Sequence, residues 1–173
     1  MTRQARPTPI SQEQIDAVLD QLSRGPSLVI SLVREIPRSI LKRRPAAGVW
    51  SVHEHACHLP AVQPLMLKRL QYMLSDPAPV ITPYEPAKDD PHDALLQVDL
   101  DAAMERFARE RGSLIDRLRK LTPAQWATTA EHGEYSHYSV FIMFRHLALH
   151  DLYHAYRIEQ RLLNKEWAAD HRV

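Results

Sequence analysis

The chain has 173 residues, of which 22 are basic and 21 acidic, and its formal charge is +1. This length suits one domain, and such a charge balance gives no electrostatic reason to bind nucleic acid. A single cysteine, Cys57, excludes an intramolecular disulfide, and no run approaches the roughly 18 apolar residues of a membrane span. The N-terminus lacks the apolar segment of a signal peptide. We therefore expect a soluble cytoplasmic protein, with one domain over residues 1–173 and a flexible N-terminus over residues 1–10.

The first predicted helix begins after Ser11, because Ser11 and Gln14 form a capping box before a run of apolar residues at helical spacing. Gly25-Pro26 predicts a break or a kink in this helix. The apolar pattern resumes over residues 28–36, and the basic run that follows leads into a loop.

A second capping box, Ser51 with Glu54, opens a helix that we expect to reach about Leu74. Pro60 and Pro64 lie inside it and predict a kink, because each removes a backbone donor and clashes with the preceding turn. The proline-rich residues 76–91 then predict an extended linker within the domain.

The second half of the chain predicts two more long helices. Residues 95–121 have apolar side chains at core-like spacing, and residues 122–125 cap a short helix with proline at its first position. A polar loop over residues 131–138 precedes the last helix, which Ser139 caps and which ends near Asn164. Four helical segments near 20 residues or longer, with little strand alternation, indicate an all-α protein and a four-helix bundle.

The chemistry of the chain is concentrated in ten histidines, six of which fall in two clusters: His53, His55 and His58, then His146, His150 and His154. Four residues along a helix turn about 40° and rise about 6 Å, so neighbours in the second cluster can point into one site. An i, i+4 histidine pair is a helical chelate for a divalent metal. The geometry favours two histidines from the last helix and one from the first cluster.

The histidines also allow other interpretations. The metalloprotease motif His-Glu-x-x-His fails by one residue, because Cys57 stands where the second histidine is required and His58 follows it. Three protein ligands with open positions are the catalytic pattern for zinc, whereas a structural zinc usually has four. Isolated histidines are more often surface or packed residues, so spacing alone does not establish a metal site.

Two motifs carry a resemblance to a known family. Trp50-Ser51 is followed after six residues by His58-Leu59, and the last helix contains His150-Asp151-Leu152-Tyr153-His154. These motifs, in this order and separation, resemble the DinB-like superfamily, which includes bacillithiol S-transferases and mycothiol-dependent maleylpyruvate isomerase. The resemblance implies a bundle with up-down-down-up connections, and it places the metal ligands on His58, His150 and His154.

Neutral imidazole ligands favour Zn²⁺ or Ni²⁺ as the cofactor, with Fe²⁺ or Mn²⁺ as alternatives. The same resemblance implies a homodimer as the assembly. It predicts a divalent-metal-dependent enzyme of the thiol-transferase or hydrolase type, in which a metal centre activates a thiol or water. The partner would be a small-molecule substrate, for example a low-molecular-weight thiol, and neither nucleic acid nor a membrane. The alternative is a non-enzymatic, metal-binding or stress-associated dimeric scaffold.

Several neighbouring residues have two interpretations each. His146 is predicted to support the site or pack in the core, with a role as alternative ligand left open, while His53 and His55 are expected at the first turn of their helix. Cys57 is expected to be a buried apolar residue. Asp151 either orients an imidazole or is exposed. Two further residues have both a structural and a substrate-related interpretation: Trp50 as a hydrophobic plug or a substrate platform, and Arg157 as a surface cation or a clamp for a carboxylate.

Overall fold

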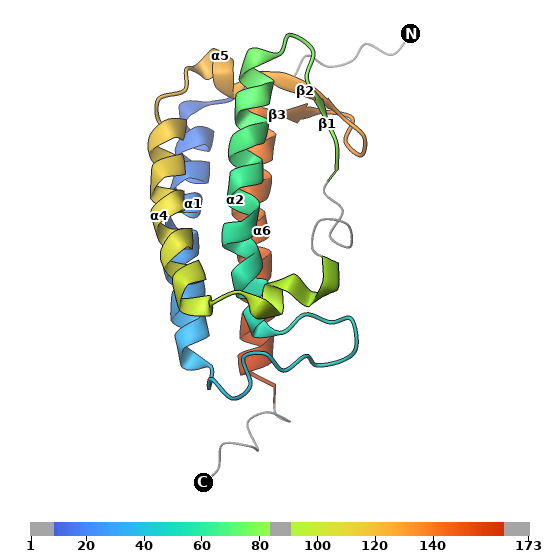
Figure 1. The fold of residues 1–173 in the computed structure, drawn as a ribbon. Coiled ribbons are helices and arrows are strands. Elements are labelled where there is room, and N and C mark those ends of the chain that lie inside the picture. The colour runs from blue at the N-terminus through green and yellow to red at the C-terminus, as the bar shows by residue number, and fades with distance from the viewer. Residues whose placement is uncertain (1–8, 84–90, 165–173) are drawn as a thin grey trace.

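The computed structural model describes residues 9–83 and 91–164, whose long helices form a bundle (Figure 1). Its elements, in chain order, are α1 (Gln12–Glu35), α2 (Val52–Ser75), β1 (Val80–Ile81), the 3₁₀ helix η1 (Pro91–Gln97), α4 (Leu100–Leu118), α5 (Pro123–Trp126), β2 (Thr129–His132), β3 (Tyr138–Ser139) and α6 (Val140–Leu162). The N-terminus that is predicted to be flexible covers residues 1–10, and residues 1–8 lie outside the described part of the chain.

The four long helices follow the expected up-down-down-up order. Helices α1 and α6 run in one direction, and α2 and α4 run in the other (Figure 1). Helix α1 packs against α4 and α6, and α2 packs against the same two, so α1 and α2 lie diagonally across the bundle. The connection from α2 to α4 is therefore a crossover between parallel neighbours, which confirms the predicted fold.

The helix starts follow the capping signals. The side chains of Ser11, Ser51 and Thr122 each accept a hydrogen bond from a backbone N–H in the first turn, and a reciprocal side chain completes each capping box. The Ser139 hydroxyl likewise accepts from the Ile142 N–H at 3.3 Å. These bonds satisfy backbone donors that the helix itself leaves unpaired.

No break occurs at Gly25-Pro26, where a break or a kink is predicted, because α1 continues through both residues. One predicted helix boundary is wrong. The segment predicted as one helix over residues 95–121 is divided into η1 and α4. Asp99 causes the division, since it has an extended backbone and its carboxylate accepts from the Ala102 N–H at 2.8 Å, which starts a new helix.

Short strands replace parts of two predicted loops. In the crossover, β1 pairs in parallel with β2, with Val80 opposite Glu131 and Ile81 opposite His132. The predicted polar loop begins and ends in strands instead, because β2 pairs antiparallel with β3. These pairings hold residues 129–139, which comprise β2, β3 and the segment between them and are called the hairpin below, against the crossover at one end of the bundle (Figure 1).

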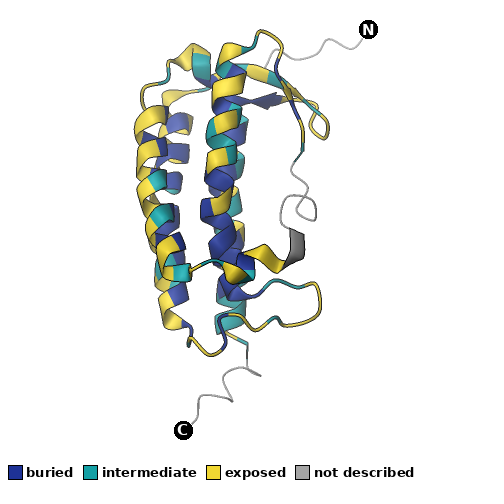
Figure 2. Cartoon of the chain, in the orientation of Figure 1, coloured by how far each residue is buried: buried dark blue, intermediate teal, exposed yellow. Residues whose placement is uncertain are grey.

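The core consists of two apolar clusters with polar side chains between them. One cluster lies toward the hairpin and includes Leu22 and Phe144, and the other lies toward the opposite end and includes Val29 and Phe107. Buried residues line the inner faces of the helices and are continuous along residues 51–60, at the start of α2 (Figure 2). No described helix combines the length and the apolar character needed to cross a membrane.

Candidate metal centre

The antiparallel packing of α2 against α6 brings both histidine clusters to one place. His58 lies in the second turn of α2, and its Nε2 atom is 3.1 Å from Nε2 of His150 on α6. His150 Nε2 is also 3.1 Å from Nε2 of His154, one turn further along α6. The three side chains each offer one nitrogen, and these nitrogens lie within 4.8 Å of one another.

These separations suit three ligands of one ion better than hydrogen bonds. A neutral imidazole nitrogen carries either a hydrogen or a lone pair, so His150 Nε2 cannot donate to one neighbour and accept from the other. Nitrogens about 2.0–2.1 Å from a metal ion lie about 2.9 Å apart at a right angle and about 3.4 Å apart at a tetrahedral angle. The observed 3.1 Å lies between these values. Three neutral imidazoles are a donor set that zinc, nickel and ferrous iron accept.

His55 holds the imidazole of His154 in place. Its Nδ1 atom is 2.8 Å from Nδ1 of His154, and both side chains are buried. If His154 Nε2 presents its lone pair to the site, its Nδ1 carries the hydrogen and donates it to His55. A partner of this kind fixes the ring orientation and tautomer of a metal ligand.

Burial keeps the imidazoles neutral, which is the form that binds a metal. It lowers the pKa of His58 to about 3, helped by His150 and His55, and lowers the pKa of His150 to about 4, helped by the Arg111 cation. The pKa of His55 is lowered to about 4, first by burial and then by Arg161 and Arg157. Burial and the neighbouring imidazoles also lower the pKa of His154 well below its usual value.

His53 and His146 lie outside the three-histidine group. His53 is buried at the start of α2, with its Nε2 atom 3.1 Å from the carbonyl oxygen of Leu95, so it joins α2 to η1. His146 packs its ring against Tyr135, with centroids 5.2 Å apart. His146 lies one turn before His150 on α6, as expected, and its side chain lines a cavity next to the site.

Three further residues have defined roles. Asp151 is buried but orients no imidazole, because its carboxylate forms an ion pair with Arg111. Cys57 is fully buried, as predicted, and burial raises the pKa of its thiol to about 12. Glu54, the acid of the rejected protease motif, accepts hydrogen bonds from Ser51 and Arg44.

Two cavities meet at the three histidines, and His58 and His150 line both of them. The tryptophan cavity, of about 510 Å³, is lined by Gly48, Val49, Trp50, His55, His58, His150, Tyr153, His154 and Arg157. The Trp50 ring lies 5.0 Å from the His58 ring and is stacked on that of His154 at 5.9 Å. Trp50 is therefore a wall of the site, which the plug interpretation did not anticipate.

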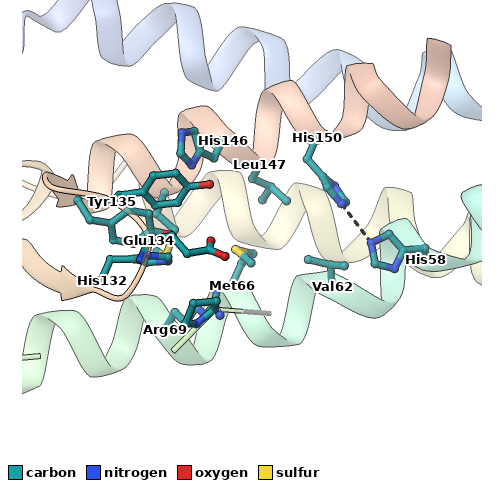
Figure 3. A pocket seen from close by; sticks show the side chains of 13 residues that line it. His58, Val62, Met66, Arg69, His132, Glu134, Tyr135, His146, Leu147 and His150 are labelled. Carbon is teal, nitrogen blue, oxygen red and sulfur yellow. Dashed lines mark hydrogen bonds between the residues drawn. The ribbon is translucent and has the colours of Figure 1, made fainter. Parts of the chain in front are cut away.

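The hairpin cavity, of about 240 Å³, follows the α2–α6 groove in the other direction. Figure 3 shows the His58–His150 pair at one end and residues of the hairpin at the other. Its polar lining residues beyond the pair are Arg69, His132, Glu134, Tyr135, Tyr138 and His146. The sequence analysis assigned no role to the four that lie in the hairpin, although residues 131–138 hold two tyrosines and two histidines.

Comparison with known proteins agrees with this architecture. The sequence matches the DinB superfamily over residues 21–158, which is most of the chain. The chain belongs to the DinB superfamily. The fold is similar to that of YfiT from Bacillus subtilis, described as a probable metal-dependent hydrolase with an unusual four-helix bundle topology. The TM-score is 0.75 at 20% identity, covering 92% of this chain and 93% of that one. No curated protein matches the sequence.

Proposed function

We propose that this DinB-superfamily protein is a divalent-metal-dependent enzyme of the hydrolase or thiol-transferase type, with His58, His150 and His154 as metal ligands. One observation carries the proposal: three imidazole nitrogens converge where two cavities meet. A divalent ion held there would lower the pKa of a bound water or thiol and supply a nucleophile near neutral pH. Zn²⁺ or Ni²⁺ fits the all-nitrogen donor set, with Fe²⁺ or Mn²⁺ as alternatives.

The residues around the site have distinct tasks in such a reaction. His55 orients His154, and Trp50 packs against the rings of His58 and His154. In the hairpin cavity, His132, Glu134 and His146 are proton acceptors on the approach to His150. Each is a candidate general base for such a reaction.

The openness of the site favours an enzyme over the scaffold. A structural zinc usually has a fourth protein ligand, and no fourth histidine, cysteine or carboxylate joins the group among the described residues. The cavities on both sides leave room for water or substrate. A purely structural ion would need neither cavity.

The homodimer remains a proposal, and α6 offers a surface for it. Leu149, Tyr153 and Tyr156 on this helix and Leu163 at its C-cap are each at least half exposed, at spacings of four, three and seven residues. Apolar side chains at this spacing would form a seam for a second copy of the helix. Light scattering on the wild type and on Leu149→Glu tests it.

Metal content tests the ligand assignment. Protein purified without an affinity tag should contain close to one metal ion per chain, and His150→Ala and His154→Ala should lose it. His146→Ala, one turn away on the same helix, is the matched control and should keep the metal. Full metal content in the His150 and His154 variants would show that the ion lies elsewhere.

Turnover tests the reaction type. Metal-loaded protein is assayed on ester and amide substrates, and on low-molecular-weight thiols with electrophilic acceptors. Hydrolysis without thiol identifies water as the nucleophile, and consumption of thiol and acceptor together identifies a transferase. Metal-dependent turnover in neither assay would favour the scaffold.

A further inference from the structure

The end of the site nearest Trp50 contains hydrogen-bond donors that lack acceptors. Among the described residues, Nε2 of His55, Nε of Arg157, and Nε and Nη2 of Arg161 are buried without a hydrogen-bond partner. The arginine atoms are donors in every state. His55 Nε2 is a donor as well, because His55 Nδ1 accepts from His154 when His154 binds a metal. A buried donor without an acceptor is destabilising, so a ligand that supplies an acceptor would bind favourably here.

The two arginines lie next to each other without a described acidic partner. Arg157 and Arg161 are one turn apart on α6, and burial together with Arg157 lowers the pKa of Arg161. Arg157 donates from Nη1 to the Gln160 side chain at 3.0 Å. No described salt bridge involves either guanidinium. Like charges at this spacing repel, and a bound anion would offset that cost.

Arg157 also faces the tryptophan cavity. It lies one turn beyond His154, and no aspartate or glutamate is among the residues that line this cavity. Its guanidinium lies 6.0 Å from the Tyr153 ring centroid, which restricts its movement. The hairpin cavity differs, because its lining includes both Arg69 and Glu134.

We propose that the tryptophan cavity is a carboxylate subsite, in which Arg157, supported by Arg161, binds an acidic group of the substrate while the reacting atom lies at the three histidines. This deepens the proposed function and rests on it. A planar guanidinium matches a carboxylate through two parallel hydrogen bonds. The Trp50 ring provides an apolar wall for the carbon chain. The substrate class is therefore a small organic acid.

Calorimetric titration with succinate tests the subsite, in both zinc-loaded and metal-free protein. Arg157→Gln should weaken succinate binding tenfold or more in both forms, since it removes hydrogen bonds to a charged group. Arg157→Lys should lose less succinate affinity than Arg157→Gln, because lysine keeps the positive charge. Arg109→Gln, an exposed arginine on α4, is the matched control and should bind like the wild type. Succinamide, the neutral analogue, should not distinguish wild type from Arg157→Gln.

The outcomes separate this proposal from the proposed function. Equal succinate affinity in the wild type and Arg157→Gln, in both forms, would overturn the carboxylate subsite. Absence of metal in the wild type would overturn the metal-dependent enzyme, while the metal-free titration would still test Arg157.

The chain's own acids are the competing source of a carboxylate, since Glu166 and Asp170 follow α6 in the sequence. A variant ending at Asn164, and the full-length Glu166→Gln/Asp170→Asn variant, remove them. Unchanged succinate affinity in these variants supports a substrate subsite. A tenfold gain in either would show that the chain's own acids occupy the cavity, and would overturn the proposal.

Discussion

His150 and Asp151 are consecutive on α6, yet their side chains belong to two different polar clusters in the same core. Asp151 pairs with Arg111, which also donates to the Gln63 side chain at 2.8 Å and to the Leu22 carbonyl oxygen at 3.1 Å. His150 faces two other imidazoles, and its Nδ1 atom has no hydrogen-bond partner among the described residues. The first cluster is satisfied within the chain, whereas the second has an unpaired nitrogen and is the site of the proposed metal ion.

The first cluster is also closely packed. A Cβ atom at Gly25 would lie 2.5 Å from the Asp151 carboxylate, so α1 can pass this close only with glycine there. Arg111 and Asp151 are each 1% exposed. The histidine cluster opens into two cavities instead. The contrast indicates that the first cluster serves stability and the second serves binding, and substitutions can test this division.

The largest effect on stability is expected when one partner of the buried Arg111–Asp151 ion pair is removed. Arg111→Met leaves the Asp151 carboxylate buried without a partner and should lower the free energy of unfolding by about 3–5 kcal/mol. The double variant Arg111→Met/Asp151→Leu, which leaves no buried charge in this cluster, should lower the free energy of unfolding by less than the single variant does. Denaturant unfolding measures both. Arg38→Met, which removes an exposed ion pair with Asp101, is the control and should cost less than about 1 kcal/mol. Equal losses in the single and double variants would show that the buried charge is not the cause.

A smaller effect, on metal affinity, is expected at His55. His55→Leu removes the partner of His154 Nδ1 and should weaken metal binding about 10–100-fold. The matched control is His53→Leu, since His53 is buried in the same turn but contacts η1. The His53→Leu variant should lower the stability of the protein without changing its metal affinity. Competition with a chromogenic chelator gives the affinities, and identical values in both variants would contradict the assigned role.

The smallest effect, counted for one histidine and one pH unit, is expected on the stability of the metal-free protein as the pH is lowered. Because burial holds the pKa of His58 near 3 and that of His150 near 4, below the usual 6.5, the unfolded chain binds more protons than the folded one in that range. Stability of the metal-free protein should therefore be full above about pH 6.5. It should fall on acidification by about 1.4 kcal/mol per pH unit for each such histidine.

Replacing a histidine of the site should reduce this slope. His150→Phe should flatten the fall between pH 6.5 and 4, as measured by unfolding in urea at several pH values. The exposed His137 provides the control, since His137→Phe should leave the slope unchanged. A wild-type stability that does not change over this range would show that the imidazoles titrate normally.

The fold was predictable because its signals are local. Capping boxes at Ser11 and Ser51 lie within single turns, so the sequence is sufficient to place the helix starts. Asp99 was missed because apolar spacing continues across it and hides the new cap. Strands β1 to β3 could not be predicted, since each is two to four residues long and exists through pairing between distant segments.

The candidate site was predictable in part. The i, i+4 spacing of His150 and His154 is a local signal, and the family resemblance selected His58 for the third position. The roles of His55, Trp50 and the hairpin residues depend on how α2, α6 and their connections pack. The role of Asp151 also depends on tertiary packing, because its partner Arg111 lies 40 residues away in the sequence and no spacing rule joins the two residues.

The three histidines stand on helices, whereas much of the lining of both cavities belongs to the connections. Trp50 lies near the end of the segment between α1 and α2, and the hairpin lies between α5 and α6. Connections tolerate substitution and insertion better than packed helices do. Under the proposed function, new substrate preferences would therefore arise by exchanging these two segments while the three histidines and the bundle stay as they are. Reactivity and selectivity would then evolve independently in this architecture.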